Sequence, residues 1–346
     1  MTISTDALII GAGPVGLFQV FELGLLGIRA HVVDTMPQIG GQCAELYPDK
    51  PIYDIPAIPV CSGQELVGNL LEQIKPFAPD FHLGQEVAEI APNCSDSFYV
   101  RTHTGTEFRT RTIIIAGGVG SFRPRRLNVE GARAFEGVSV HYRVKDISAF
   151  EGKDIVVLGG GDSALDWALD LYNKANSLVL VHRSQQFRAA PASVARMREL
   201  CDAHEMQFLE GDVTALLGAE GKLSAVAIGS RDGVTRRLEL DALLVLFGLS
   251  PKLGPISNWG LELDRKQILV DTEKFQTNVS GIFAVGDINT YPGKKKLILS
   301  GFHEAALAAF GVQQHINPDK KVHLQYTTTS PIMHERLGVK VRESAA

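Results

Sequence analysis

Cysteine is scarce in this sequence, and no two cysteines stand at a motif spacing. The 346 residues contain four of them, Cys43, Cys61, Cys94 and Cys201. Without a Cys-x-x-Cys pair, neither a local dithiol relay nor a zinc site of ordinary spacing is indicated. Scattered thiols are typical of proteins in reducing compartments, so the sequence predicts a cytoplasmic protein with no bound metal.

An excess of positive charge and an uninterrupted apolar run are also missing. The formal net charge is −5, which argues against a nucleic-acid partner. Residues 7–28 are apolar overall, but Pro14, Gln19 and Glu22 interrupt them, and no basic segment precedes them. This pattern favours neither a membrane span nor a signal peptide. Nucleic acid and membrane are therefore not expected as partners.

The first motif follows an apolar run at residues 7–10, which predicts a short buried strand. Gly11, Gly13 and Gly16 then stand in the spacing G-x-G-x-x-G, and residues 17–26 continue with helical periodicity. In this spacing the first glycine permits a tight turn and the second lets backbone amides approach a pyrophosphate. The third lets helix and strand pack closely. The positive end of the helix dipole favours phosphate at the turn.

A second strand is predicted at residues 30–33, and it ends in Asp34. An acid at this position can accept hydrogen bonds from ribose hydroxyls. Because strand, glycine turn, helix and acid occur in order, the stretch predicts a dinucleotide site.

The same pattern starts again at residues 155–158 and continues through Gly159, Gly160 and Gly161 into a predicted helix. The next predicted strand, residues 177–181, does not end in an acid. His182 and Arg183 stand there, and Arg188 comes soon after. Basic side chains attract a 2′-phosphate, whereas a carboxylate repels it. The second site is therefore predicted to bind NADP(H).

The remaining pattern is typical of an α/β protein. A loop rich in Pro and Gly is expected at residues 35–59, and a helix at 62–77 with Ser62 and Glu65 as a capping box. Alternating runs at residues 86–90, 98–102 and 107–111 predict a small antiparallel sheet, and residues 112–116 a buried strand. A later strand at 281–285 and a helix at 299–314 complete the first domain. The predicted fold is α/β, with two Rossmann-like dinucleotide-binding domains of three-layer ββα type, the first of them discontinuous.

These motifs together resemble the two-dinucleotide-binding flavoprotein family, and in particular its thioredoxin-reductase branch. The resemblance is carried by both glycine turns, by Gly40, Gly41 and Gln42, by His182 with Arg183, and by Gly286 with Asp287. It implies FAD in an outer domain, residues 1–116 and 248–346, and NADPH in an inserted domain, residues 117–247.

The sequence departs from the disulfide-dependent members of that family. Thioredoxin reductases carry a Cys-x-x-Cys just before the second fingerprint, and residues 139–146 contain no cysteine. The glutathione-reductase branch has a second cysteine soon after the first, and Pro48 stands at that position after Cys43. A dithiol relay needs two sulfurs, so Cys43 is predicted to be a packed thiol.

The rest of the pattern resembles the ferredoxin–NADP reductases that share this scaffold. The match rests on residues 46–50, on Phe122, on residues 258–261 and 296–302, and on an extension from residue 322. In that family the extension crosses to the flavin of the partner subunit, which implies a homodimer.

This resemblance also implies the site residues. Tyr47 and Tyr326 would stack on the two faces of the flavin. The full FAD set is Gly11, Gly13, Pro14, Gly16, Asp34, Gly41, Gln42, Tyr47, Val87, Phe122, Asp287, Tyr326 and Thr328. The NADPH set is Gly159, Gly161, Asp162, Ser163, Ala164, His182, Arg183 and Arg188. Relatives often carry a second arginine where Ser184 stands, so a weakened preference for NADPH is expected.

The implied activity is hydride transfer from NADPH to flavin N5, followed by single-electron transfer to ferredoxin or flavodoxin, without a side-chain acid or base. Two basic clusters are candidate contacts for an acidic carrier: Lys294, Lys295 and Lys296, and Arg123, Arg125 and Arg126. Two alternatives stay open. One is a flavoprotein reductase that serves a separate disulfide or peroxide system, and the other is a sensor that binds FAD and NADPH without turnover.

Overall fold

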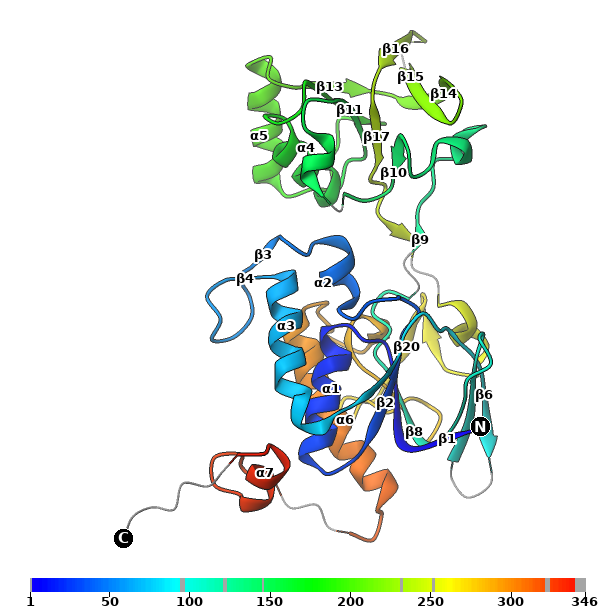
Figure 1. Cartoon of the computed structure of the whole chain (residues 1–346), viewed down its shortest axis with the longest axis vertical. Helices are drawn as coiled ribbons and strands as arrows, with labels where there is room; N and C mark the ends of the chain where they lie inside the picture. Colours follow the sequence, from blue (N-terminus) through cyan, green and yellow to red (C-terminus); the bar gives the residue numbers. More distant parts are fainter. Residues whose placement is uncertain are drawn as a thin grey trace. The chain divides into compact units, whose positions relative to one another are not determined.

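The computed structural model describes residues 2–93, 97–120, 123–144, 146–230, 233–250, 253–320 and 324–339. The chain divides into two compact units (Figure 1). Unit 1 comprises residues 1–121 and 251–346, and unit 2 comprises residues 122–250. Unit 2 is thus inserted into the sequence of unit 1, and each unit has its own parallel sheet. Both sheets are of the Rossmann-like type that the sequence predicts.

Unit 1 is built on five parallel strands. The central pair is β1 (Ile3–Ile10) and β8 (Glu107–Ile115). β2 (Ala30–Val33) and then β5 (Asp80–His82) extend the sheet beyond β1, and β21 (Ile282–Ala284) pairs with the other side of β8. Because these strands are parallel, their carboxyl ends and the loops after them lie along one edge of the sheet.

The first half of β8 has a second role. It pairs antiparallel with β7 (Ser97–Thr102), which pairs in turn with β6 (Val87–Asn93). The predicted antiparallel strands are therefore present. They form no separate sheet, because residues 107–115 make one continuous strand shared by both arrangements.

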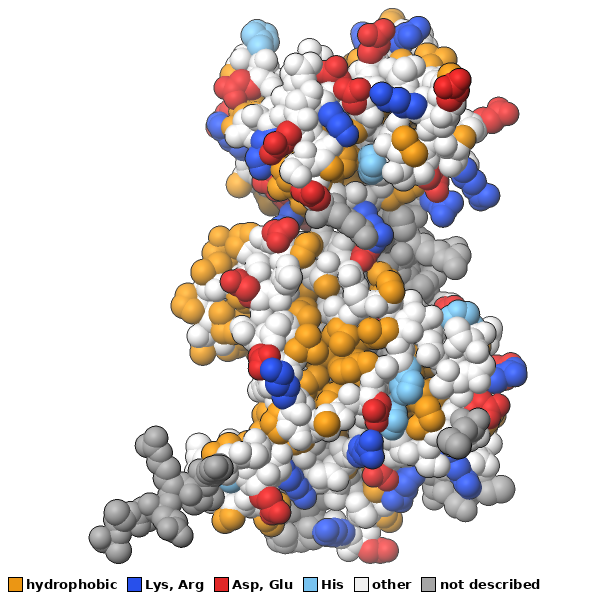
Figure 2. Space-filling model, viewed as in Figure 1, with side chains coloured by type: hydrophobic (Ala, Val, Ile, Leu, Met, Phe, Trp, Pro, Cys, Tyr) orange, Lys and Arg blue, Asp and Glu red, His pale blue; other side chains and the backbone are white. Residues whose placement is uncertain are grey.

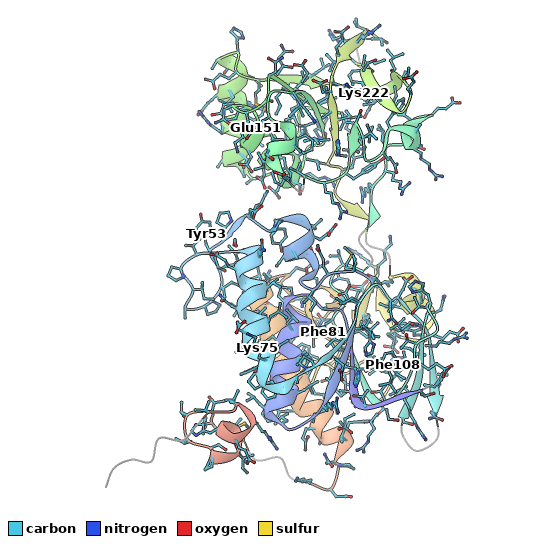
Figure 3. The ribbon with its side chains drawn as sticks, viewed as in Figure 1. Tyr53, Lys75, Phe81, Phe108, Glu151 and Lys222 are labelled. Atoms are coloured by element: carbon cyan, nitrogen blue, oxygen red, sulfur yellow. The ribbon has the colours of Figure 1, made fainter. Side chains whose placement is uncertain are left out.

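Two layers cover the parallel sheet of unit 1. The helices α1 (Pro14–Leu25), α3 (Gly63–Ile74) and α6 (Ile298–Ile316) pack on one face (Figure 1). The β6–β7 ribbon and residues 253–288 pack on the other. Phe81 belongs to the helical side, and the fully buried Phe108 to the opposite core (Figure 3). The residues after residue 253 include η4 (Gly254–Asn258), β19 (Leu263–Asp264), β20 (Gln267–Leu269), η5 (Gly286–Ile288) and β22 (Asn289–Thr290).

Helix α3 begins where the sequence predicts. The Ser62 hydroxyl accepts a hydrogen bond from the Glu65 amide at 3.1 Å, and the Glu65 carboxylate accepts one from the Ser62 amide at 2.7 Å. These bonds hold the pKa of Glu65 below its usual range. The capping box is thus confirmed. The last turn is a separate 3-10 helix, η1 (Lys75–Phe77).

The expected loop at residues 35–59 is only partly irregular. It contains a six-residue helix, α2 (Gly41–Leu46), and the short strand β3 (Pro51–Ile52), which pairs with β4 (Cys61–Ser62). The prediction of an unbroken loop was wrong because a helix of fewer than two turns carries no hydrophobic period. Tyr53, just after β3, is exposed on the connection between the two strands (Figure 3).

Unit 2 repeats the arrangement with a smaller sheet. Its five parallel strands lie in the order β10 (Val140–His141), β17 (Ala242–Val245), β11 (Asp154–Leu158), β12 (Ser177–His182) and β13 (Gln207–Glu210). α4 (Asp162–Leu171) and α5 (Pro191–Asp202) pack in one core, and the antiparallel strands β14 (Asp212–Ala219), β15 (Lys222–Gly229) and β16 (Thr235–Glu239) contribute to the other. Shorter elements are β9 (Arg123–Pro124), η2 (Ala132–Phe135), η3 (Ile147–Phe150) and β18 (Leu249–Ser250).

In the described residues after α6, the chain forms one further helix, α7 (Pro331–Arg336). Figure 1 shows it at the end of unit 1 opposite to α2. Among the described helices, none combines the length and the apolar character that a membrane crossing requires.

Candidate dinucleotide-binding sites

The first glycine turn joins β1 to α1 through backbone contacts that exclude side chains. A Cβ atom on Gly16 would collide with the carbonyl oxygen of Gly11, and one on Gly11 with the carbonyl oxygen of Ala116. Gly11 also has a φ of +116°, which favours glycine. These two positions therefore require glycine for the fold itself, as the sequence predicts.

Gly13 is different, because the position that a Cβ atom would take there is not filled by neighbouring atoms. A Cβ atom there would have as its nearest described neighbour the Cα of Gly41, 3.8 Å away. Pro14 occupies the first helical position, and its missing amide leaves no donor unused there. The remaining amides of the first turn and the helix dipole favour an anion at this place. The cradle fits the pyrophosphate of a dinucleotide.

Asp34 reaches back from the end of β2 to this turn. Its buried carboxylate accepts hydrogen bonds from the amides of Ala12 at 2.6 Å and Met36 at 2.7 Å. Burial raises the pKa of Asp34, and the two amides oppose that shift. Each carboxylate oxygen keeps a second lone pair, so Asp34 can still accept from ribose hydroxyls.

Helix α2 contributes two further predicted residues. The side-chain nitrogen of Gln42 lies 3.3 Å from where a Cβ of Gly118 would stand, so Gln42 reaches the segment after β8. The Tyr47 hydroxyl accepts a hydrogen bond from the Cys43 thiol at 3.6 Å. Burial, followed by Cys43 and the negative charges of Asp287 and Asp54, raises the pKa of Tyr47 far above its usual range. Tyr47 therefore stays a neutral phenol.

Asp287 comes from the far end of the sequence to the same place. It lies on η5, between β21 and α6, and its charge raises the pKa of both Cys43 and Tyr47. The structure thus brings Gly11, Gly13, Gly16, Asp34, Gly41, Gln42, Tyr47 and Asp287 together along the carboxyl edge of the sheet in unit 1.

Four of the other residues predicted for FAD lie elsewhere or outside the described residues. Val87 is buried in the core at the start of β6, so only its backbone is available to a ligand. Phe122 lies outside the residues that the structure describes. Tyr326 is 66% exposed, and Thr328 is also exposed.

Residues 324–339, which we name the C-terminal hook, form a compact segment around α7. The Thr327 carbonyl contacts His334 Nε2 at 2.6 Å, and the Tyr326 carbonyl accepts from the Ser330 amide at 2.9 Å. Arg336 donates to the Leu25 carbonyl at the C-terminal end of α1. The glycine turn lies at the other end of this helix, roughly 18 Å away for its 12 residues. Within one chain, the hook does not join the other predicted FAD residues.

The second glycine turn, in unit 2, repeats the first. A Cβ atom on Gly159 would lie 2.5 Å from the Leu246 carbonyl oxygen, whereas no described atom lies within 4 Å of one on Gly161. Asp162 accepts a hydrogen bond from the Ala190 amide at 2.8 Å. Ser163 is exposed at the start of α4 and Ala164 is buried beneath it. The open side of Gly161 fits the pyrophosphate of a second dinucleotide.

The last residue of β12 and the loop after it carry the predicted basic residues. The His182 ring packs against Gly160, and its Nε2 atom lies 3.2 Å from the Gln186 carbonyl oxygen. Burial, with smaller effects of Arg183 and Arg188, lowers the pKa of His182. The Arg188 amide donates to the Gly160 carbonyl at 2.7 Å. Arg183 and Arg188 are exposed beside the turn, so they, and not His182, supply positive charge at neutral pH.

The two predicted basic clusters are not uniformly exposed and unpaired. Lys294 is buried and pairs with the buried Glu304, so it cannot steer a carrier, while Lys295 and Lys296 are exposed. Arg126 pairs with Glu136 at 3.3 Å. Arg125 is exposed, and the side chain of Arg123 is not described. Figure 2 shows basic and acidic side chains interspersed over the visible face of unit 2.

All three described cysteines are free thiols. Cys43 and Cys61 are free and buried, and Cys201 is free and half-buried. Burial raises the pKa of Cys43, which keeps its thiol protonated. Cys94 lies outside the described residues. In the part of the chain that the structure covers, no group of three or more His, Cys, Asp or Glu residues is arranged to hold a metal ion.

Comparison with known proteins gives a consistent family. Residues 5–309 match the model of the pyridine nucleotide-disulphide oxidoreductase family. The chain is 65% identical over 335 residues to a protein of Cupriavidus metallidurans named ferredoxin–NADP reductase 2, covering 97% of this chain and 91% of the relative. It is 64% identical over 342 residues to a ferredoxin–NADP reductase of Methylibium petroleiphilum, covering 98% and 93%.

Solved structures show the same fold at low identity. Thioredoxin reductase of Lactococcus lactis superposes with a TM-score of 0.76 at 24% identity, covering 91% of this chain and 99% of that one. Bacillithiol disulfide reductase of Staphylococcus aureus superposes with a TM-score of 0.74 at 17% identity, covering 92% and 100%.

Two alanine substitutions should separate the two sites. The folded chain has room for a methyl group at Gly13 and at Gly161, but each methyl would project into a cradle for phosphate. We expect Gly13→Ala to weaken FAD binding about tenfold and leave the KM for NADPH unchanged. Gly161→Ala should raise the KM for NADPH about tenfold and leave FAD binding unchanged. FAD titration of the apo-protein and steady-state kinetics measure both.

Each variant is the control for the other, and Gly16→Ala is the control for folding. Its Cβ would meet the Gly11 carbonyl, so it should lower the unfolding temperature. Gly13→Ala with wild-type affinity for FAD would show that the first cradle does not face the phosphates.

Proposed function

The chain belongs to the pyridine nucleotide-disulphide oxidoreductase family, and we infer that it is a ferredoxin–NADP(+) reductase that uses FAD and NADPH. It transfers electrons between NADPH and ferredoxin. The observation that carries this conclusion is an identity of 64–65% over nearly the whole chain to two reductases of that name. The glycine cradles at Gly13 and Gly161 are the matching structural feature.

Bound FAD exchanges an electron pair with NADPH as a hydride and exchanges single electrons with an iron–sulfur carrier. The residues of this chain position the cofactors and perform no proton transfer in that exchange. We propose that unit 1 holds FAD through the Gly13 cradle, Asp34 and Asp287, and that unit 2 holds NADPH through the Gly161 cradle. A neutral Tyr47 suits a flavin cover, because a phenolate beside the ring would oppose its reduction.

The thiols distinguish this chain from the disulfide reductases of the same fold. Those enzymes carry a cysteine pair either just before the second glycine turn or soon after the Gly-Gly of the first domain, and this sequence has a pair at neither place. Cys43 is buried and donates a hydrogen bond to the Tyr47 hydroxyl. A thiol that stays protonated is a poor nucleophile. This supports an acceptor other than a protein disulfide.

We further propose that the protein is a cytoplasmic homodimer in which the C-terminal hook serves the partner subunit. The hook holds Tyr326 and Thr328 exposed and far from the glycine turn of their own chain. Leu324, Ile332 and Val339 are also exposed on it, at 64%, 47% and 53%. Apolar side chains gathered in one segment favour a protein partner, and a second copy would place Tyr326 over its flavin.

Tyr326→Ser tests this arrangement. Loss of the aromatic cover should raise the fluorescence of bound flavin, because stacked tyrosine quenches it, while FAD stays bound. Tyr326→Phe keeps a ring and should behave like the wild type. Unchanged fluorescence in Tyr326→Ser, or a monomer in sedimentation of the wild-type holoenzyme, would refute the trans cover.

Arg183 and Arg188 are proposed to bind the 2′-phosphate of NADPH. Charge-assisted hydrogen bonds contribute about 1.5–3 kcal/mol each. The double variant R183A/R188A should therefore raise the KM for NADPH more than about tenfold and change that for NADH little. Arg196→Ala is the control, since Arg196 is an exposed arginine of the same unit that pairs with Glu199. Equal losses with both coenzymes would exclude a role in phosphate recognition.

The acceptor assay tests the function as a whole. The purified holoenzyme should reduce ferredoxin with NADPH, coupled to cytochrome c, and flavodoxin is proposed as a second carrier. Thioredoxin with a thiol reagent should give only background. If Lys295 and Lys296 steer an acidic carrier, the rate falls as salt rises, because screening shortens the field to roughly 8 Å at physiological ionic strength. The variant K295M/K296M should lose that salt dependence.

Robust reduction of thioredoxin would favour the disulfide alternative. Flavin reduction by NADPH without transfer to any ferredoxin or flavodoxin would favour a sensor.

A further inference from the structure

A buried ion pair lies behind η5, the turn that carries Asp287. Glu304, on α6, is 0% exposed, and the side chain of Lys294 is 5% exposed. The Lys294 ammonium donates to the Glu304 carboxylate and, at 2.9 Å, to the carbonyl oxygen of Gly286. The pair joins the second turn of α6 to the loop between β22 and α6.

The Glu304 carboxylate has more partners than the lysine. One oxygen accepts from the Gly286 amide at 2.7 Å and from the Asn289 side-chain amide at 2.9 Å. The other accepts from the Tyr291 hydroxyl at 2.9 Å as well as from Lys294. Burial, together with this contact, raises the pKa of Tyr291 to about 12. A buried network whose central carboxylate is fully hydrogen-bonded holds its members rigidly.

The network fixes a single residue from both sides. Lys294 holds the carbonyl of Gly286, and Glu304 holds its amide. Gly286 has a φ of +79°. A Cβ atom on Gly286 would lie 3.4 Å from the side chain of Val15 on α1, so Gly286 packs closely against that helix. Its neighbour is Asp287, whose charge acts on Tyr47 and Cys43. The orientation of Asp287 therefore depends on how Gly286 is held.

Burying this pair is costly, because both ions lose their hydration. An apolar pair of the same volume would stabilise a fold at least as well in many cases. A role confined to stability is therefore a weak reason for charges at these two positions. What an apolar pair cannot do is donate to the Gly286 carbonyl and accept from its amide.

We propose that Lys294 and Glu304 are positioning residues for FAD, which hold Gly286 so that Asp287 faces the cofactor. The inference rests on the FAD site proposed for unit 1. Neither residue needs to touch FAD, and both act through the backbone of Gly286.

Lys294→Met tests the inference, with Lys295→Met as the matched control. Both remove one cation at neighbouring positions, but Lys295 is exposed. FAD is removed from each protein and titrated back, with binding followed by flavin fluorescence. We expect Lys294→Met to raise the dissociation constant for FAD about tenfold and to shift the visible absorption band of bound FAD. Lys295→Met should leave both unchanged.

A second variant guards against loss of folding. Lys294→Met leaves Glu304 buried without its cation, which can prevent folding. K294M/E304Q buries no charge, so its unfolding temperature without FAD should lie near that of the wild type. The Gly286 carbonyl still lacks its donor in this variant, so we expect FAD binding to weaken here as well.

The outcomes are distinct. The proposal would be overturned if folded Lys294→Met bound FAD with the affinity and absorption of the wild type, even if its unfolding temperature fell. If Lys294→Met does not fold, the same result in K294M/E304Q would overturn it. A wild-type protein that binds no FAD would instead refute the cofactor assignment.

Discussion

Close contact between two backbones is the constraint on which both units depend. In unit 1, α1 can start directly at the end of β1 only because Gly16 brings no side chain against the Gly11 carbonyl. In unit 2, Gly159 meets the Leu246 carbonyl as Gly11 meets that of Ala116 in unit 1. These contacts hold each turn so that one glycine, Gly13 or Gly161, opens toward a ligand. The two units differ in the charge of the residues after the second strand: a carboxylate, Asp34, in one and exposed arginines in the other. That difference in charge is the basis on which we propose FAD for unit 1 and NADPH for unit 2.

The sequence predicts the parts of this arrangement that are local. The strand, turn and helix of each fingerprint, the Ser62 capping box and the acid after β2 all depend on residues near one another in the chain. The burial of Lys294 does not depend on nearby residues in the chain. This lysine stands in a run of three lysines, and it is buried only because Glu304 lies beside Gly286 once α6 has packed. Helix α2 is too short to show a period. The hook docks through Arg336 on the end of α1, a contact without a local signal.

The electrostatics of the proposed FAD site keep a thiol and a phenol neutral and pair a buried carboxylate with a cation. Burial raises the pKa of the Cys43 thiol and the Tyr47 phenol, and Asp287 raises both further. Glu304 adds no net charge, because Lys294 neutralises it. Asp287 and Asp54 are then the carboxylates whose charge acts on Tyr47, and Asp287 lies on a turn that the buried pair contacts. Such a site offers positions and hydrogen bonds to a cofactor, and the described cysteines form no disulfide.

We therefore expect the electrons that enter this protein to be held by FAD alone. An anaerobic titration of the holoenzyme with dithionite, followed by the absorbance of the flavin and by a thiol assay, counts them directly. A reductase without a dithiol relay should take up about two electrons per bound FAD and gain no free thiols. Uptake of about four electrons, with two new thiols per chain, would reveal a redox-active disulfide and contradict the absence of a protein relay.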